Sequence, residues 1–171
     1  MSALFEELPL DAESRASEAD HVSLRLWLRL LTCTTMIERR VRERLRERFD
    51  ITLARFDLMA QLARVPKGLR MSELSRRLMV TGGNVTGLTD QLVGEDLVVR
   101  RELPDDRRVY TVRLTAKGRR AFDAMAEEHE RWIVALFADV APDERDALYH
   151  LLGVLKAKLA RAGGARREGA R

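Results

Sequence analysis

The side chains able to do covalent or metal chemistry are few and lie far apart in this sequence. It has three histidines, His21, His129 and His150, and a single cysteine, Cys33. One cysteine forms no intramolecular disulfide, and with three scattered histidines it forms no zinc cluster. The sequence contains no glycine-rich phosphate loop, no HExxH and no Gly-x-Ser-x-Gly. We therefore expect no enzymatic activity, no catalytic residue, no metal site and no cofactor.

Hydrogen-bonding chemistry is concentrated in one short stretch that follows a tight turn at Met79-Val80. We expect Thr81 to cap a helix whose first turn faces outward. Asn84 and Thr86 on that turn can read base edges in the major groove of DNA. Gly82 and Gly83 are poor helix residues, but without side chains their backbone N–H groups could approach a phosphate closely. A loosely formed helix start is the alternative explanation of the two glycines.

Charge and composition favour a soluble, mostly helical protein with a basic middle. Residues 66–120 contain twelve Lys/Arg against seven Asp/Glu, an excess of five, and such a patch attracts polyanions. Apolar residues make up 46% of the 171 residues and aromatic residues only 5%, which is typical of a helical globular domain. The apolar runs are too short for a membrane span, and the acidic first twenty residues do not resemble a secretory signal. We therefore expect a cytoplasmic protein without membrane contact.

Apolar periodicity predicts helices on both sides of this basic middle. We expect a long helix over 22–49 and a shorter one over 53–63. A helix-turn-helix follows, with one helix over 72–78 capped by Ser72 and a second over 82–95. Two long helices close the chain, from Thr115 to about 137 and from Pro142 onward.

Two β-rich runs, 97–102 and 109–114, predict a hairpin with a charged loop over 103–108. The expected fold is thus mostly α with a small β-hairpin wing, a winged helix-turn-helix with long dimerisation helices. We expect a flexible acidic arm over 1–20, the winged-helix domain over 21–162 and a disordered basic tail over 163–171. Within the domain the DNA-binding lobe spans about 53–114, and the dimerisation helices span 22–49 and 115–160.

The order of these elements resembles the MarR family of transcription regulators. The resemblance covers about 22–159 and rests on MSELSRRL (71–78), NVTGLTDQL (84–92), DDRRVY (105–110) and LTAKG (114–118). It implies that the helix beginning after Thr81 is the recognition helix. Gly87 departs from the family, because many members carry a long polar or basic side chain at this place. The helix therefore has fewer side chains that can contact bases.

The resemblance also assigns roles on the wing. Asp106 and Arg108 match the family's Asp-x-Arg, in which a carboxylate holds a guanidinium that enters the minor groove. An exposed ion pair of little consequence is the alternative. Arg101 and Arg107 are expected to contact the phosphate backbone. The long outer helices imply a homodimer that places two recognition helices about 34 Å apart on a pseudo-palindromic operator in double-stranded DNA.

The family's usual switch is a ligand pocket between the dimerisation helices and the DNA-binding lobe. The expected lining here is His21, Arg25, Trp27, Arg29 and Phe56. Arginine with aromatic rings suits an aromatic acid or its CoA thioester. The segments LWLRLL (26–31) and GGNVTG (82–87) resemble regulators of aromatic-acid catabolism, including hydroxycinnamoyl-CoA sensors. The alternative is that Trp27 and Phe56 belong to the core and that the arginines are solvated.

The main hypothesis is a repressor of aromatic-catabolism genes that is released by such a ligand. A thiol redox switch on the same fold is one alternative. However, Cys33 is surrounded by Leu30, Thr34 and Ile37, and none of these is a base that could activate the thiol. We therefore expect Cys33 to be a buried structural cysteine. A nonspecific architectural DNA-binding protein is the other alternative.

Overall fold

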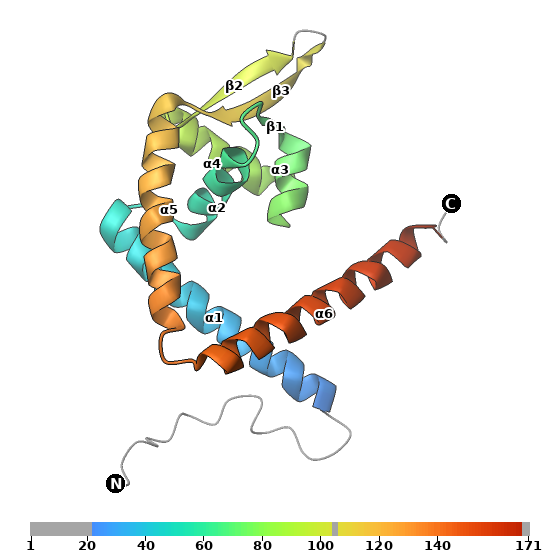
Figure 1. Cartoon of the computed structure of the whole chain (residues 1–171). Coiled ribbons are helices and arrows are strands. Elements are labelled where there is room, and N and C mark those ends of the chain that lie inside the picture. The colour runs from blue at the N-terminus through green and yellow to red at the C-terminus, as the bar shows by residue number, and fades with distance from the viewer. Residues whose placement is uncertain (1–21, 104–105, 169–171) are drawn as a thin grey trace. The chain divides into compact units, whose positions relative to one another are not determined.

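The computed structural model describes residues 22–103 and 106–168, which fold into six helices and three strands. The chain divides into two compact units, one up to His129 and one from Glu130 onward. The first unit contains the helix-turn-helix and the sheet, so it holds the predicted DNA-binding elements (Figure 1). The elements in chain order are α1 (Val22–Phe49), α2 (Leu53–Ala63), β1 (Leu69–Arg70), α3 (Met71–Leu78), α4 (Gly82–Gly94), β2 (Val98–Leu103), β3 (Asp106–Leu114), α5 (Ala116–Leu136) and α6 (Pro142–Glu168).

The two N-terminal helices confirm the predicted ranges 22–49 and 53–63. Thr52 caps α2, because its hydroxyl oxygen accepts a hydrogen bond from the Arg55 backbone N–H at 3.3 Å. Helix α1 is buried only near its C-terminal end, at Val41 and Leu45. Its N-terminal half keeps large apolar side chains between 45 and 68% exposed: Val22, Leu24, Leu26, Trp27, Leu31 and Met36.

The core of the first unit lies between the C-terminal end of α1, α2, the helix-turn-helix and the sheet. Each of these elements contributes side chains with almost no exposed surface, because each presents one apolar face to the others. The fully buried side chains are Leu45, Leu58, Met59, Leu62, Leu74, Val85, Thr89, Leu92, Val98 and Val112. This shared core is what holds α4 in a defined place.

The helix-turn-helix has a sharp left-handed turn. Met79 ends α3 with φ of 55°, and the Ser75 hydroxyl donates to the Val80 carbonyl at 2.6 Å across the turn. The predicted cap at Ser72 is wrong. Helix α3 begins one residue earlier, and the Glu73 carboxylate accepts from the Arg70 backbone N–H at 3.0 Å. A carboxylate three residues into the helix is better placed to close the start than the Ser72 hydroxyl.

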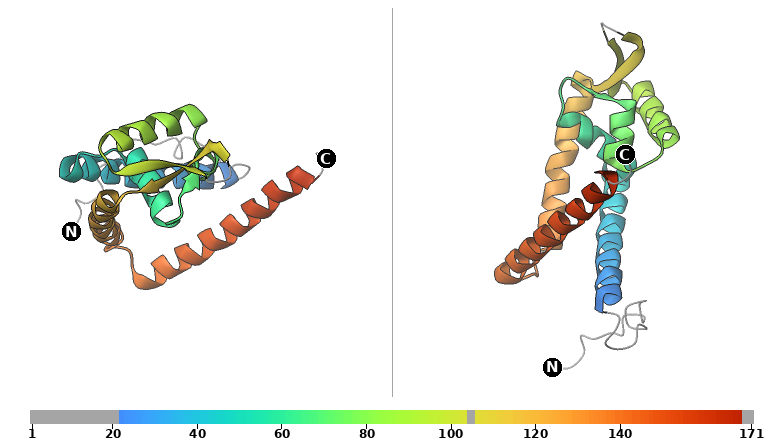
Figure 2. Two further views of the ribbon diagram at one scale, coloured as in Figure 1. Left: turned by 90° about the horizontal axis from the view of Figure 1, so that it is seen from above. Right: turned by 90° about the vertical axis from the view of Figure 1, so that its right-hand side faces the viewer.

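The sheet has three antiparallel strands in the order β1-β3-β2. The β2–β3 hairpin projects from the lobe at the end away from α1 (Figure 1; Figure 2). Strand β3 begins at Asp106, so the prediction that residues 106–108 lie in the loop is wrong, because the strands pair further than the apolar alternation extends. The two-residue β1 was not predicted, and Leu69 pairs with Val112.

The last two helices begin where the sequence indicates. Gly118 lies where α5 passes the chain before β2, and a Cβ atom there would be 1.8 Å from the Leu97 carbonyl oxygen. Helix α6 continues to Glu168, which corrects the predicted disordered tail over residues 163–168. Alanine, arginine and glutamate are good helix formers and offset the two glycines there. None of the described helices combines the length and the apolar character needed to cross a bilayer.

Candidate nucleic-acid interface

Helix α4 has one face in the core and one face in solvent. Val85, Thr89 and Leu92 are buried. The opposite face exposes the predicted readers Thr81, Gly82, Gly83, Asn84 and Thr86. This arrangement follows from the 3.6-residue period, which places the apolar side chains on a single stripe. The exposed face is therefore free for a partner.

The start of α4 keeps backbone donors available. Thr81 is the N-cap residue, but its side chain makes no capping hydrogen bond. The first intrahelical bond runs from the Val85 N–H to the Thr81 carbonyl at 3.2 Å. The preceding N–H groups of the first turn have no partner inside the helix. A Cβ at Gly82 or Gly83 would meet nothing within 4 Å, so an anion could approach these donors closely.

The wing lies in β2 and β3. Arg101 is exposed on β2, and its carbonyl accepts a hydrogen bond from the Thr111 hydroxyl at 3.3 Å. The register shifts between Glu102 and Leu103, next to the hairpin tip. The side chains of Asp106, Arg107 and Arg108 lie outside the described residues, so the expected Asp106–Arg108 contact stays a prediction.

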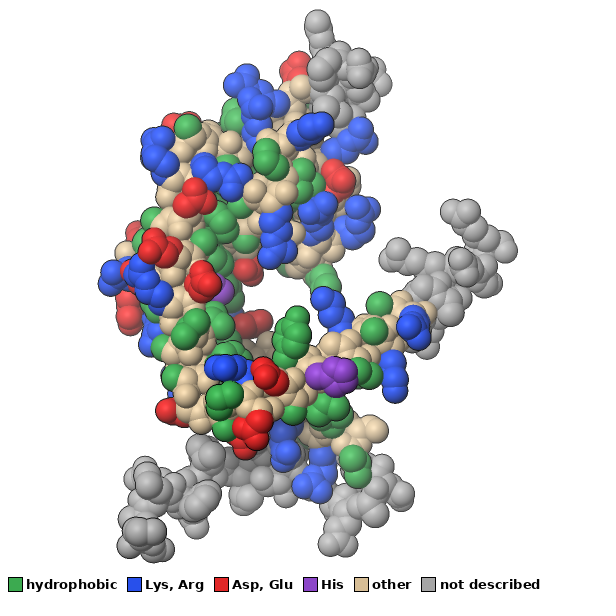
Figure 3. Space-filling view, viewed as in Figure 1, with side chains coloured by type: hydrophobic (Ala, Val, Ile, Leu, Met, Phe, Trp, Pro, Cys, Tyr) green, Lys and Arg blue, Asp and Glu red, His purple; other side chains and the backbone are tan. Residues whose placement is uncertain are grey.

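A basic surface surrounds these elements. In Figure 3, Lys and Arg side chains gather over the part of the molecule that carries α3 and the hairpin. The exposed basic residues of this region are Lys67, Arg70, Arg76, Arg77, Arg101 and Arg113. Only Arg101 among them was singled out from the sequence. The excess of basic residues over 66–120 was the available signal, but it does not say which side chains share a face.

Ion pairs tie α4 to its neighbours. Asp90 of α4 binds Arg100 of β2 at 2.6 Å. At the C-terminal end of the helix, the Glu95 carboxylate pairs with Arg55 of α2, and the Glu95 carbonyl accepts from the Lys117 ammonium at 2.7 Å. These contacts join the helix to α2, to the sheet and to the start of α5. None of them was predicted, because their partners are 10 to 40 residues apart.

The residues predicted to line a ligand pocket are not brought together. Arg25, Trp27 and Arg29 are exposed on α1. Phe56 is instead a core residue, 5% exposed, with its ring 5.6 Å from that of Phe122 and 5.0 Å from that of His129, measured between centroids. Phe56 lies on the inward face of α2, which agrees with the alternative explanation that this residue belongs to the core. His21 lies outside the described residues.

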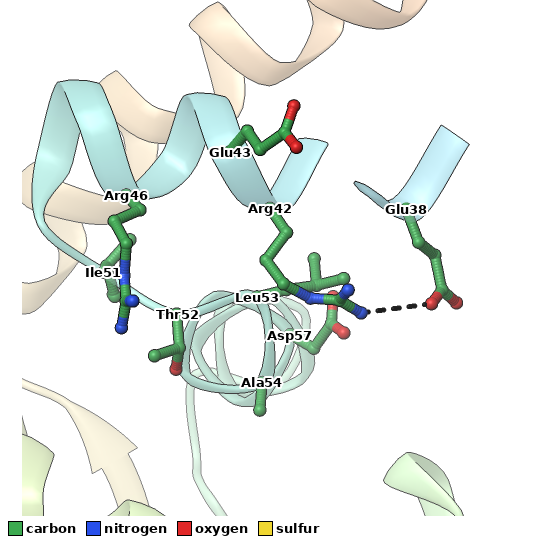
Figure 4. A pocket seen from close by; sticks show the side chains of 9 residues that line it. All are labelled: Glu38, Arg42, Glu43, Arg46, Ile51, Thr52, Leu53, Ala54 and Asp57. Carbon is green, nitrogen blue, oxygen red and sulfur yellow. Dashed lines mark hydrogen bonds and ion pairs between the residues drawn. The ribbon is translucent and has the colours of Figure 1, made fainter. Parts of the chain in front are cut away.

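The structure has a pocket elsewhere, between the C-terminal half of α1 and the start of α2. Its volume is about 520 Å³. In Figure 4, Arg42 and Arg46 extend from α1 toward the start of α2, and Glu43 points away from α2. Arg42 is paired with Glu38 at 3.4 Å, whereas Arg46 makes no ion pair within the described part of the chain. Ile51, Leu53 and Ala54 supply apolar lining.

Two titratable groups near this pocket have shifted pKa values. Burial raises the pKa of Asp57, the nearby Glu38 carboxylate raises it further, and His129 opposes the shift. Burial lowers the pKa of His129, against a smaller opposite effect of Asp57. Both groups are therefore biased toward their neutral forms.

Cys33 does not follow the prediction. Its thiol is exposed, because the N-terminal half of α1 keeps most of its side chains exposed. The expectation of a buried cysteine is wrong for the chain as described.

Comparison with known sequences shows which protein family has this helix-turn-helix and wing. The sequence model of the MarR family matches residues 49–109, which contain the helix-turn-helix and the first part of the wing. An uncharacterized HTH-type transcriptional regulator of Bacillus cereus is 31% identical over 128 residues, which is 74% of this chain and 84% of the relative. The HTH-type transcriptional repressor YetL of Bacillus subtilis is 31% identical over 91 residues, covering 53% of this chain and 54% of the repressor.

Solved structures agree. A MarR family transcriptional regulator from Silicibacter pomeroyi is 33% identical, covers 84% of this chain and 99% of its own, and superposes with a TM-score of 0.68. The regulator BldR from Sulfolobus solfataricus has a TM-score of 0.72 over 85% of this chain and 99% of its own, at 22% identity, and supports the fold alone. The matched proteins are transcription regulators, not enzymes.

Proposed function

Because this chain belongs to the MarR family of transcription regulators, which bind DNA, we propose that it is a homodimeric repressor of a pseudo-palindromic operator. Helix α4 enters the major groove through its first turn. The β2–β3 wing reaches the adjacent minor groove with Arg108, oriented by Asp106, while Arg101 and Arg107 contact phosphates.

The single observation that supports this proposal best is the exposed first turn of α4. It combines unpaired backbone donors, two glycines that leave open space, and the exposed amide of Asn84. The basic surface around it neutralises phosphates and steers the protein to DNA. Repression is supported by the likeness to YetL, which is itself named a repressor.

Dimerisation is supported by apolar surface that a solitary chain leaves in water. Helix α6 exposes Leu148, Tyr149, Leu151, Leu152, Val154 and Leu159, and α1 exposes the apolar residues of its N-terminal half. A monomer rarely leaves this many large apolar side chains in water on each of two helices. Two-fold pairing through these helices also gives the two half-sites that a palindrome requires.

We keep an aromatic acid or its CoA thioester as the proposed effector class. The pocket between α1 and α2 supports it, because Arg46 offers an unpaired guanidinium beside the apolar side chains of Ile51 and Leu53. Its volume of about 520 Å³ suits an aromatic acid. The predicted set on α1, Arg25 with Arg29, remains the competing location. A ligand at either place must favour a conformation that misplaces the recognition helices, since equal affinity for both states shifts nothing.

Selection of duplexes from a randomised library by the full-length chain tests the regulator proposal. We expect enrichment of a short palindrome, and footprinting should show two protected half-sites about one helical turn apart. Binding without an enriched sequence would favour the architectural alternative.

Release of the selected duplex by benzoate, 4-hydroxycinnamate and their CoA thioesters then tests the effector. Alanine at Arg46 is compared with alanine at Arg25 and at Arg29. Loss of the response to the effector only in Arg46→Ala would locate the effector between α1 and α2. Loss only in Arg25→Ala and Arg29→Ala would locate it at the residues of α1 that the sequence predicts. No release by any of the compounds in the parent would remove this effector class.

The exposed Cys33 gives the redox alternative one observation in its favour. Peroxide should leave DNA binding unchanged if the thiol has no regulatory role. Release by peroxide that disappears in Cys33→Ser would instead make the thiol switch the preferred function.

A further inference from the structure

The ion pair between Asp90 and Arg100 joins the two elements that read DNA. Asp90 lies on the exposed face of α4, two turns beyond Thr81–Asn84, and Arg100 lies on β2, which leads into the wing. Their Oδ1 and Nη2 atoms are 2.6 Å apart, a close charge-assisted contact. The Arg100 side chain is 35% exposed and the Asp90 side chain 55% exposed.

The backbone alone joins α4 to β2 only at the end of the helix. The Leu97 N–H donates to the Leu92 carbonyl at 2.9 Å, and the strand begins at Val98. The Asp90–Arg100 pair adds a second connection, closer to the base-reading turn. Arg100 is also in register with the buried Val112 of the central strand, so its backbone is held by the sheet. The shared core already holds α4 in place, and the ion pair adds a restraint on the angle between α4 and β2 at a point well separated from the end of the helix.

We propose that Asp90 is a positioning residue for DNA recognition: it holds Arg100 and so fixes the angle between the recognition helix and the wing. This inference rests on the proposed function. The wing and the first turn of α4 must meet adjacent grooves at the same time. Freedom between them would cost conformational entropy on every specific encounter.

Charge alone predicts that removing the Asp90 carboxylate strengthens DNA binding, whereas a positioning role predicts that it weakens specific binding. The direction of the change in affinity therefore tests the inference. Asp90 is an acidic residue on the face of α4 that approaches DNA phosphates. Its neutralisation should strengthen binding to any duplex if charge is all that matters. If Asp90 positions the wing, its neutralisation should weaken binding to the specific duplex while binding to nonspecific DNA does not weaken.

The experiment measures fluorescence anisotropy of the full-length parent, Asp90→Asn and a control, Asp96→Asn. The probes are the duplex enriched from the randomised library and a scrambled duplex of the same composition. Asp96 is an exposed acid just beyond α4 with φ of 57°, a conformation that asparagine tolerates, and its side chain has no ion pair in the described structure. The control makes the same change of charge near the same helix.

We expect Asp90→Asn to reduce the ratio of specific to nonspecific affinity about threefold to thirtyfold, the usual coupling between contacting residues. Asp96→Asn should leave this ratio unchanged. The melting temperature should stay close to the parent's, because exposed ion pairs contribute little stability. An unchanged ratio in Asp90→Asn, or equally strengthened binding to both duplexes, would overturn the inference.

If Asp90→Asn is unstable, exchanging the two charges of the pair still tests whether Asp90 positions Arg100. Asp90→Arg and Arg100→Asp are compared singly and together, and the double variant has the parent's net charge. Restored discrimination in the double variant supports the pair, and discrimination no better than the worse single variant overturns it. Failure of the parent to enrich any sequence would remove the proposed function itself, whereas a discriminating parent with an indifferent Asp90→Asn removes only this inference.

Discussion

At the scale of single residues, the proposed readers differ in what their loss should do. Arg108→Ala should weaken operator binding by about 1–3 kcal/mol, because it removes a specific contact in the minor groove. Asp106→Ala should cost less, since the guanidinium remains. Arg108→Lys should retain only part of the operator affinity, because an ammonium group is more strongly hydrated than a guanidinium and lacks its planar pair of donors.

Anisotropy titrations on operator and scrambled duplexes at two salt concentrations check this prediction. Asn84→Ala is the comparison within the major groove, where sequence preference should relax. A phosphate contact would instead weaken binding to both duplexes and reduce the salt slope by about one. Unchanged operator affinity in Arg108→Ala would show that the wing is not a reader.

Asp57 predicts a pH-dependent stability. Its raised pKa means that the folded state favours the protonated carboxyl, so this contribution is present below about pH 4 and lost as the pH rises through the raised pKa. His129, with its lowered pKa, is neutral at pH 7.5 and offers Asp57 little attraction there. Asp57→Asn should therefore raise the free energy of unfolding at pH 7.5, by less than about 1 kcal/mol because Asp57 lines an open pocket.

Urea unfolding at pH 7.5 and at pH 4 measures this effect. The gain of Asp57→Asn over the parent should shrink at the lower pH. Asp123→Asn changes an exposed acid of α5 and should show neither the gain nor its pH dependence. A less stable Asp57→Asn at pH 7.5 would mean that the carboxylate makes a favourable interaction that outweighs its burial.

At the scale of elements, two helical glycines should respond oppositely to the same substitution. A Cβ at Gly87 of α4 meets open space, so Gly87→Ala should stabilise the protein by about 0.8–1 kcal/mol, the difference in helix propensity. A Cβ at Gly118 of α5 would overlap the Leu97 carbonyl oxygen at 1.8 Å. Gly118→Ala should therefore destabilise the protein by more than about 1 kcal/mol, since α5 must move away from the strand.

Thermal and urea unfolding of the two variants measure this contrast. The open space at Gly87 also means that no packing within the described chain requires a glycine there. Equal destabilisation by both substitutions would contradict the open surroundings of α4.

At the scale of the whole molecule, the exposed apolar side chains of α6 predict an obligate partner. Light scattering at micromolar concentration should give about twice the chain mass of 19.6 kDa. Leu152→Asp should shift the mass toward the monomer, because a charge buried without a partner costs several kcal/mol. Met79→Asp is the matched control: Met79 is 92% exposed on the helix-turn-helix, and the dimer should persist. A monomeric parent would contradict the two-half-site proposal.

Much of the fold was predictable because it is recorded in local patterns. The 3.6-residue apolar period predicted the bounds of α1 and α2, and Thr81 marked the start of α4. The turn at Met79-Val80 and the wing strands followed from equally local signals.

The remaining features depend on residues far apart in the chain, so only the tertiary structure decided them. Strand β1 is two residues long, and it exists because Leu69 meets Val112 across the sheet. A helical period shows that Phe56 faces inward but does not distinguish a pocket from the core, and the contacts with Phe122 and His129 place it in the core. The Asp90–Arg100 pair likewise needs α4 and β2 packed together, because burial and ion pairing are properties of neighbours in space and a sequence pattern reports only neighbours in the chain.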